Sequence, residues 1–284
     1  MREQQKDPAI PTIQHDARTI NFEVAGAGPT LVLLPPGASR AVAWRGVMDR
    51  LAERFHMIAI DVTGFGGTDP WSHDRPLTLD DEADAIAAVI ESVVGDDGAP
   101  VHLAGHSFGG AIALRLAVTG KAPLASLTLV EPAPYPILAE AGEDALYEEA
   151  ATINLGFIEA VAEGRSEAAF ERYIDYYTDG PGAWIAFSGK ARARFLHSAS
   201  DVARALAAVH ADGMKRADVA ALDLPAQLIH GALTSGPHAR LCEVLAETIP
   251  GAGLSVVEKA GHMLTMTHPG PVAALIAELV GHRP

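Results

Sequence analysis

The feature that most constrains this chain is a short apolar segment that turns sharply into a helix-forming segment. Residues 101–104 open the segment, and residues 111–117 favour a helix. Between them stands Gly105-His106-Ser107-Phe108-Gly109, a G-x-S-x-G pattern. Glycines two residues on either side of Ser107 avoid the collisions that side chains would make in so tight a turn. The segment predicts strand, turn and helix, with Ser107 exposed as a nucleophile; the alternative is a serine that only caps the helix.

Strand and helix patterns alternate along most of the chain. This alternation predicts an α/β fold with a mainly parallel, twisted sheet flanked by helices. Residues 18–25 alternate apolar and polar, as in a half-exposed strand. Further strands are expected at 30–34, 56–62, 101–104, 124–130, 226–231 and 254–258, and helices at about 43–54, 79–94, 237–249 and 269–280.

The alternation stops between residues 135 and 215, which show helical periodicity and no clear strand. This segment holds ten of the sixteen aromatic residues and all five tyrosines. Most aromatics on a helical stripe pack against one another. We interpret residues 135–215 as a helical lid on a core formed by residues 1–134 and 216–284. Lid residues such as Tyr135 are candidates for contact with a substrate.

The composition argues against several classes of partner. A formal net charge of −15 disfavours nucleic acids and anionic membrane surfaces, and no apolar run approaches the ~20 residues of a membrane helix. With no H-E-x-x-H, no cysteine pair and no Walker loop, we expect neither a metal nor a cofactor. The single cysteine, Cys242, and the polar first seven residues favour a cytoplasmic protein with a small-molecule substrate. A homodimer is compatible with the sequence.

A serine nucleophile needs a base and a third group that orients the base. His262 follows the last predicted strand at its carboxyl end, where the ligand sites of parallel sheets lie. Because the chain has twelve histidines, position alone leaves His262 as one candidate base among others.

Several stretches resemble, in the same order, the α/β-hydrolase superfamily, in its lidded branch of esterases, haloalkane dehalogenases, epoxide hydrolases, perhydrolases and carbon–carbon bond hydrolases. The resemblance covers about residues 18–134 and 225–282. It implies an α/β-hydrolase fold with a helical lid inserted after the sixth strand, and His262 as the general base. It also implies an oxyanion hole made by the backbone N–H groups of Phe108 and Ala38. The stretches that carry it are Leu31-Val32-Leu33-Leu34-Pro35-Pro36-Gly37, Asp61-Val62-Thr63-Gly64-Phe65-Gly66-Gly67-Thr68-Asp69, Gly105-His106-Ser107-Phe108-Gly109-Gly110 and Ala260-Gly261-His262.

The chain departs from the family pattern in two places. Pro36-Gly37 stands where the family usually has His-Gly, which leaves the shape of the oxyanion loop open. Residues 231–238, where the family most often places its acid, contain no carboxylate. Some members place the acid at the end of the preceding strand, which here is Glu131. A carboxylate buried there needs a partner, so we predict Glu131 as the acid; the alternatives are an exposed glutamate and a triad without an acid.

A serine in the nucleophile position argues against dehalogenase and epoxide hydrolase activity, which in this family use aspartate there. The sequence therefore predicts a cofactor-free serine hydrolase that cleaves a small or medium uncharged ester through an acyl-enzyme. Carbon–carbon bond hydrolysis, lactone opening and perhydrolysis on the same triad stay open. The alternative of another class is a non-catalytic small-molecule receptor or scaffold that keeps the hydrolase fold.

Overall fold

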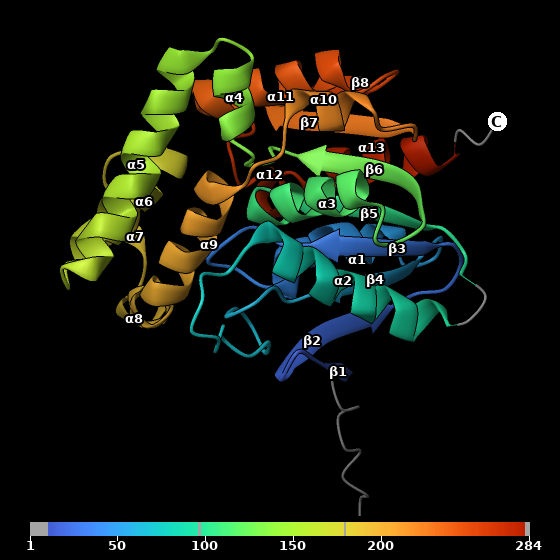
Figure 1. Ribbon diagram of the computed structural model, residues 1–284, viewed down its shortest axis with the longest axis horizontal. Coiled ribbons are helices and arrows are strands. Elements are labelled where there is room, and N and C mark those ends of the chain that lie inside the picture. Colours follow the sequence, from blue (N-terminus) through green and yellow to red (C-terminus); the bar gives the residue numbers. More distant parts are fainter. Residues whose placement is uncertain (1–10, 96–97, 179, 282–284) are drawn as a thin grey trace, which may run out of the picture.

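An eight-stranded sheet runs through the centre of the molecule (Figure 1). The computed structural model describes residues 11–95, 98–178 and 180–281. Within them the strands are β1 (Thr12–His15), β2 (Arg18–Ala25), β3 (Thr30–Leu34), β4 (His56–Ile60), β5 (Val101–His106), β6 (Leu124–Val130), β7 (Ala226–Gly231) and β8 (Gly253–Val257). Their order across the sheet is β1-β2-β4-β3-β5-β6-β7-β8. β2 pairs antiparallel with both β1 and β4, and all other neighbours are parallel.

Helices cover both faces of the sheet. On β3, Leu31 and Leu33 pack into an apolar cluster with α1 (Arg45–Leu51) and α13 (Pro269–Gly281). Val32 and Leu34 point to the other face, into a cluster with α2 (Leu79–Val94), α3 (Phe108–Thr119) and α11 (Gly236–Thr248). Because both sets of alternating side chains are buried, the central strands are continuously apolar in sequence. The short helices α10 (Arg216–Ala220) and α12 (Leu264–Thr267) complete the core.

A helical insert joins β6 to β7. Its helices are α4 (Pro136–Glu140), α5 (Asp144–Ala162), α6 (Ser166–Tyr177), α7 (Ala183–Ala186), α8 (Gly189–His197) and α9 (Ala199–Ala211). The arrow of β6 points toward these helices, so the insert lies at the carboxyl end of that strand (Figure 1). Its aromatic rings pack largely on one another: Phe170 lies 5.0 Å from Phe157 and stacks on Trp184 at 5.5 Å between centroids. The prediction of a helical insertion after the sixth strand is confirmed, whereas the division into a core and a lid at residues 135–215 stays a prediction.

The structure differs from the sequence prediction near the amino terminus. β1 has no counterpart among the strands that the sequence predicts. It joins β2 through Asp16 and Ala17, which have φ angles of 47° and 59°, and so tight a turn lacks the usual Asn-Gly signature. The helix expected at 43–54 is a 3-10 turn (Ala41–Trp44) followed by α1, which ends at Leu51. None of the helices in the described residues is both long and apolar enough to cross a bilayer.

Candidate active site

Ser107 occupies a sharp turn between β5 and α3. Its backbone angles are φ 54° and ψ −115°, which are strained for a residue with a side chain. A Cβ on Gly105 would lie 2.2 Å from the carbonyl oxygen of Gly109, and a Cβ on Gly109 would lie 2.5 Å from that of Leu34. Neither position has space for a larger residue, so the packing of the turn itself requires both glycines.

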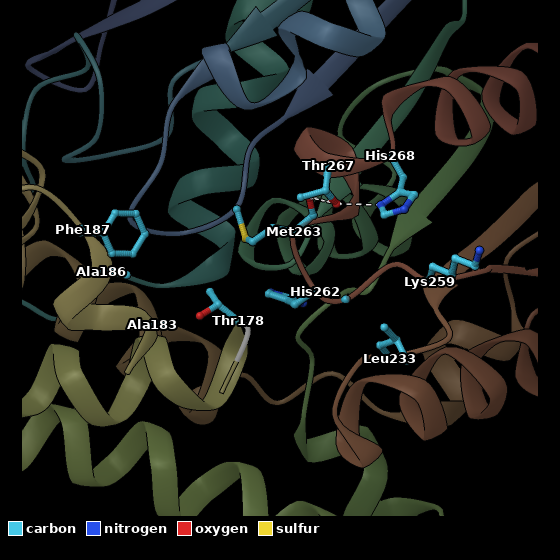
Figure 2. A pocket seen from close by; sticks show the side chains of 11 residues that line it. Thr178, Ala183, Ala186, Phe187, Leu233, Lys259, His262, Met263, Thr267 and His268 are labelled. Atoms are coloured by element: carbon cyan, nitrogen blue, oxygen red, sulfur yellow. Dashed lines mark hydrogen bonds between the residues drawn. The ribbon is translucent and has the colours of Figure 1, made fainter. Parts of the chain in front are cut away.

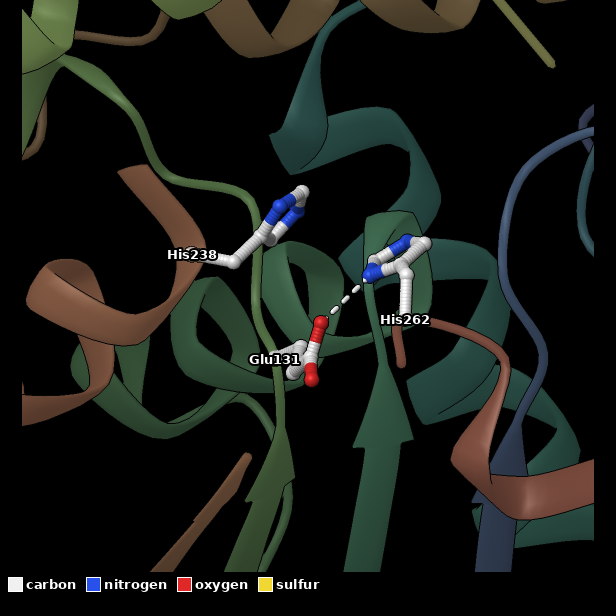
Figure 3. Close-up of side chains that lie close together, drawn as sticks. All are labelled: Glu131, His238 and His262. Carbon is white, nitrogen blue, oxygen red and sulfur yellow. Dashed lines mark hydrogen bonds and ion pairs between the residues drawn. The ribbon is translucent and has the colours of Figure 1, made fainter. Parts of the chain in front are cut away.

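Three side chains that are distant in sequence form one hydrogen-bonded series. Nε2 of His262 lies 3.1 Å from Oγ of Ser107, and Nδ1 of His262 lies 2.6 Å from Oε2 of Glu131 (Figure 3). The three residues follow β5, β8 and β6, so the sheet gathers them at the carboxyl ends of these strands. With Nδ1–H donating to the carboxylate, Nε2 is left to accept the serine proton. This is the tautomer that a general base needs.

Glu131 is completely buried and has a φ of 40°. Its Oε1 accepts the amide of Gly231 at 2.8 Å, and its Oε2 accepts the hydroxyl of Thr234 at 2.6 Å in addition to His262. Burial alone would raise the pKa of Glu131. The hydrogen bond and charge of His262, with smaller contributions from His238 and Thr234, lower that pKa to about 2 instead. Glu131 is therefore an ionised acceptor, and Thr234, from the loop that lacks a carboxylate, supports it.

The backbone amides of Ala38 and Phe108 are the predicted donors of the oxyanion hole. Within the described residues, neither Ala38 nor Phe108 has its N–H in a hydrogen bond. Phe108 is the first residue of α3, where helical amides lack partners, and a Cβ on Gly37 would lie 3.6 Å from the Cβ of Phe108. The amide of Gly109 donates to the oxygen of Pro35 at 3.2 Å, which joins this loop to α3 despite the departure at Pro36. The role of the two amides as an oxyanion hole stays a prediction.

His106 lies inside the G-x-S-x-G pattern, which marks the two glycines and Ser107 but not this histidine. It is fully buried, and burial lowers its pKa to about 3, so the ring is neutral. Nε2 donates to the carbonyl oxygen of His262 at 2.9 Å, and Nδ1 accepts the hydroxyl of Thr265 at 3.1 Å. His106 therefore holds the backbone of the loop that carries His262. Its place beside Ser107 is the only signal in the sequence.

A further buried histidine, His238 on α11, packs against His262. The ring centroids are 4.2 Å apart and the planes are inclined by 36°. Nδ1 of His238 is hydrogen-bonded to Ser235 and Nε2 to the hydroxyl of Tyr135, each at 3.0 Å. Tyr135 is 2% exposed and its hydroxyl also contacts that of Tyr177 at 3.2 Å. Contact between Tyr135 and a substrate stays a prediction, and in this structure the hydroxyl is already occupied.

A cavity of about 650 Å³ opens beside His262 (Figure 2). Phe187 and Ala186 of the insert border one end, and Lys259 and His268 border the other. His262 lies between the two ends, so a bound molecule would pass across the imidazole. The remaining lining residues are Thr178, Ala183, Leu233, Gly261, Met263 and Thr267.

A family model matches most of the chain. Residues 31–275 match the model described as "Alpha/beta hydrolase family". The chain belongs to the alpha/beta hydrolase family. The resemblance drawn from the sequence motifs is thereby confirmed, and the parallel sheet, the turn at Ser107 and the insert after β6 are features of an alpha/beta hydrolase fold.

Relatives of this alpha/beta hydrolase include enzymes with named activities. It is 26% identical over 266 residues to a pimeloyl-[acyl-carrier protein] methyl ester esterase of Aeromonas hydrophila subsp. hydrophila, which covers 93% of this chain and 100% of the relative. It is 27% identical over 268 residues to a 2-hydroxymuconate semialdehyde hydrolase of Pseudomonas sp. strain CF600, which covers 92% and 89%. Among solved structures, a hydrolase from Pseudomonas aeruginosa superposes with a TM-score of 0.76 at 19% identity over 96% of this chain and 99% of that chain. At 19% identity, the similarity to this solved structure shows a shared fold and nothing more.

One group of side chains in this alpha/beta hydrolase has the residue types of a metal site. Donor atoms of Glu131, His238 and His262 lie within 4.8 Å of one another (Figure 3). Each of the three side chains is already hydrogen-bonded: Glu131 to His262, and His238 to Ser235 and Tyr135. A metal ion would have to break the contact between Glu131 and His262. The expectation of no metal stays a prediction.

Proposed function

We propose that this member of the alpha/beta hydrolase family is a serine hydrolase that cleaves a small or medium uncharged ester through an acyl-enzyme. The observation that carries the proposal is the series Ser107–His262–Glu131. Nε2 of His262 lies 3.1 Å from Oγ of Ser107, and Nδ1 lies 2.6 Å from Oε2 of Glu131. Serine, a neutral imidazole and an ionised carboxylate in this order are what an acyl transfer to serine requires. None of the proposed steps draws on a cofactor.

In the proposed first step, Oγ of Ser107 attacks the ester carbonyl carbon while Nε2 of His262 takes the hydroxyl proton. The carbonyl oxygen becomes an oxyanion, which the amides of Ala38 and Phe108 would stabilise. The tetrahedral species then expels the alcohol, which receives the proton from His262, and leaves an acyl-enzyme. A water molecule repeats the sequence with His262 as base, releases the carboxylic acid and regenerates Ser107. Glu131 keeps the imidazole in its tautomer and stabilises the imidazolium.

The lining of the cavity supports an uncharged acyl group. The border formed by the insert consists of Ala183, Ala186 and Phe187, with Met263 facing them across the cavity, and such side chains favour hydrocarbon over charge. The esterase from Aeromonas hydrophila, whose name gives a methyl ester as its substrate, supports the ester assignment. The 2-hydroxymuconate semialdehyde hydrolase supports the second candidate, carbon–carbon bond hydrolysis on the same triad.

Labelling with a fluorophosphonate tests whether the site is a hydrolase or a receptor. The wild-type protein should be labelled rapidly on Ser107, because the probe reports an activated serine. His262→Ala should lose at least about 10³-fold in labelling rate, since the base is gone. Intact-mass spectrometry measures the rate, and peptide mapping locates the adduct. A wild-type protein that stays unlabelled at millimolar probe would favour the non-catalytic receptor.

A chain-length series of p-nitrophenyl esters tests where the acyl group lies. Phe187→Ala removes apolar surface from the insert end of the cavity, so KM for a hexanoate ester should rise about 3- to 10-fold while KM for an acetate ester changes little. Ile185→Ala is the matched control, because Ile185 on α7 lies two residues before Phe187, is 66% exposed and does not line the cavity. Equal KM changes for both esters, or for both variants, would place the acyl group elsewhere.

A further inference from the structure

His238 forms one wall around the imidazole of His262. Its ring centroid lies 4.2 Å from that of His262. Figure 3 shows the two rings side by side, with Glu131 reaching His262 beside them. The ring centroids of His106 and Tyr177 lie 5.0 Å and 5.5 Å from that of His262. The imidazole that links Ser107 to Glu131 therefore packs among three flat rings, of which His238 is the nearest.

A buried series of hydrogen bonds fixes His238 to the insert. The series runs from Ser235 through His238 to Tyr135 and Tyr177, and on to Asn154 of α5. Asn154, His238 and Tyr135 are at most 2% exposed. Buried polar groups of this kind are expensive unless each is paired. The ring of His238 is thus held at both of its nitrogens and cannot rotate freely.

The donors in this series allow one tautomer of His238. Tyr177 donates its single proton to Oδ1 of Asn154 at 2.9 Å, so its oxygen must accept from Tyr135. The proton of Tyr135 is then used, and Nε2–H of His238 must donate to Tyr135. Nδ1 of His238 accepts from the hydroxyl of Ser235. His238 is thereby specified as the neutral Nε2–H form.

Charge around His238 favours the same neutral state. Burial is the main cause that lowers the pKa of His238, and nearby His262 and His106 lower it further, while Glu131 opposes them. Tyr135 and Tyr177 face the ring from the insert side and stay protonated, since burial raises the pKa of each. A neutral ring can lie against His262 when His262 becomes an imidazolium, whereas a charged ring would repel it.

We propose that His238 is a positioning residue for the general base: its neutral ring, fixed by Ser235 and Tyr135, holds the ring of His262 between Ser107 and Glu131. The inference rests on the proposed function of His262. Without this wall, the imidazole would have room to turn toward the position of His238, because neither the bond to Glu131 nor the more distant rings of His106 and Tyr177 fill that space. Misplacement of a catalytic group by about 1 Å can reduce the rate by about 10²-fold.

Substitution of His238 by Ala and by Phe tests this role. His238→Ala should lower kcat for a p-nitrophenyl ester by about 10- to 100-fold and leave KM within about twofold, since no substrate contact is lost. Water entering the void should favour the charged base and move the acidic limb of the pH profile of kcat/KM about half a unit or more to higher pH. His238→Phe restores a flat ring, so kcat should return to within about threefold of wild type. The acidic limb of the pH profile of kcat/KM should then lie at its wild-type pH.

The control is His102→Ala. His102 is a buried histidine at the opposite end of β5, hydrogen-bonded to Ser126 at 2.8 Å. Its loss should lower the melting temperature without moving kcat or the pH profile. Wild-type kcat and profile in folded His238→Ala, or a His238→Phe protein no better than His238→Ala, would overturn the inference.

Failure of the inference about His238 can be distinguished from failure of the proposed function. If His238→Ala does not fold, His238→Leu replaces it in the comparison, because leucine fills the space without a flat face; Leu and Phe variants of equal rate would then overturn the inference. A wild-type protein without fluorophosphonate labelling would instead overturn the proposed function. Labelled wild type with unchanged His238 variants would remove only the role of His238.

Discussion

Ser107→Ala is expected to lower kcat for a p-nitrophenyl ester by about 10⁵- to 10⁶-fold, because removal of a serine nucleophile costs about as much as removal of a whole triad. The fold should persist, since alanine can occupy the turn as serine does. Initial rates at saturating ester, with circular dichroism as a check on folding, measure the effect. The expectation follows from the position of Oγ of Ser107, 3.1 Å from Nε2 of His262.

Ser126→Ala provides a matched control for this loss. Ser126 on β6 is a buried serine whose Oγ lies 2.8 Å from a histidine ring nitrogen, that of His102. It follows no sharp turn and lies at the other end of the sheet from the cavity. Its substitution should leave kcat within about twofold. A Ser107→Ala protein that keeps a tenth of the wild-type rate would show that another group is the nucleophile.

Glu131→Gln is expected to lower kcat by about 10⁴-fold, the size of loss that follows when the acid of a triad becomes its amide. The amide nitrogen would donate toward Nδ1 of His262 and favour the wrong tautomer, while KM should change little. The control is Glu82→Gln, because Glu82 is also a buried glutamate, 1% exposed, but it accepts the amide of Thr63 at 3.4 Å and does not contact His262. Near-wild-type turnover in Glu131→Gln would remove the carboxylate from the mechanism.

The same substitution should change how stability depends on pH. The pKa of Glu131 in the folded protein is about 2, below its ordinary value of 4.5. Its contribution to the free energy of unfolding is therefore fully present above pH 4.5 and is lost as the pH falls through 2. Urea unfolding from pH 7 to pH 3 should show the difference between wild type and Glu131→Gln shrinking below about pH 4.5. A difference that grows toward low pH would contradict the assigned ionisation.

The parts of the fold that follow from local patterns could be predicted. The turn at Ser107 has a steric signature, and the strand and helix periods around it predict the parallel sheet; the alpha/beta hydrolase fold is confirmed. Glu131 could be selected because the family resemblance implies two places for the acid: residues 231–238 hold no carboxylate, whereas one directly follows β6. The structure brings Ser107, Glu131 and His262 together as predicted, and their catalytic roles stay predictions.

The parts that depend on packing between distant segments could not be predicted. His238 lies in a helical segment without any local mark, and its role follows only from the 4.2 Å approach of its ring to His262. Thr234 resembles any loop threonine until its hydroxyl is seen 2.6 Å from Glu131. His106 sits inside a recognised pattern, but that pattern leaves its residue type free. No alternation or spacing encodes such contacts, because they arise when α11 and the loops after β7 and β8 meet.

In the proposed mechanism, the position of Glu131 would link turnover to the choice of substrate. Glu131 directly follows β6, and four residues later Tyr135 leads into the insert. One strand end thus bears both the carboxylate proposed to orient the base and the attachment point of the helices of the insert. A change in the insert that adapts it to a bulkier acyl group would be transmitted to that attachment point. Variants selected for new substrates by mutating the insert are therefore expected to need compensating changes near residues 131–135 before kcat returns to the wild-type value.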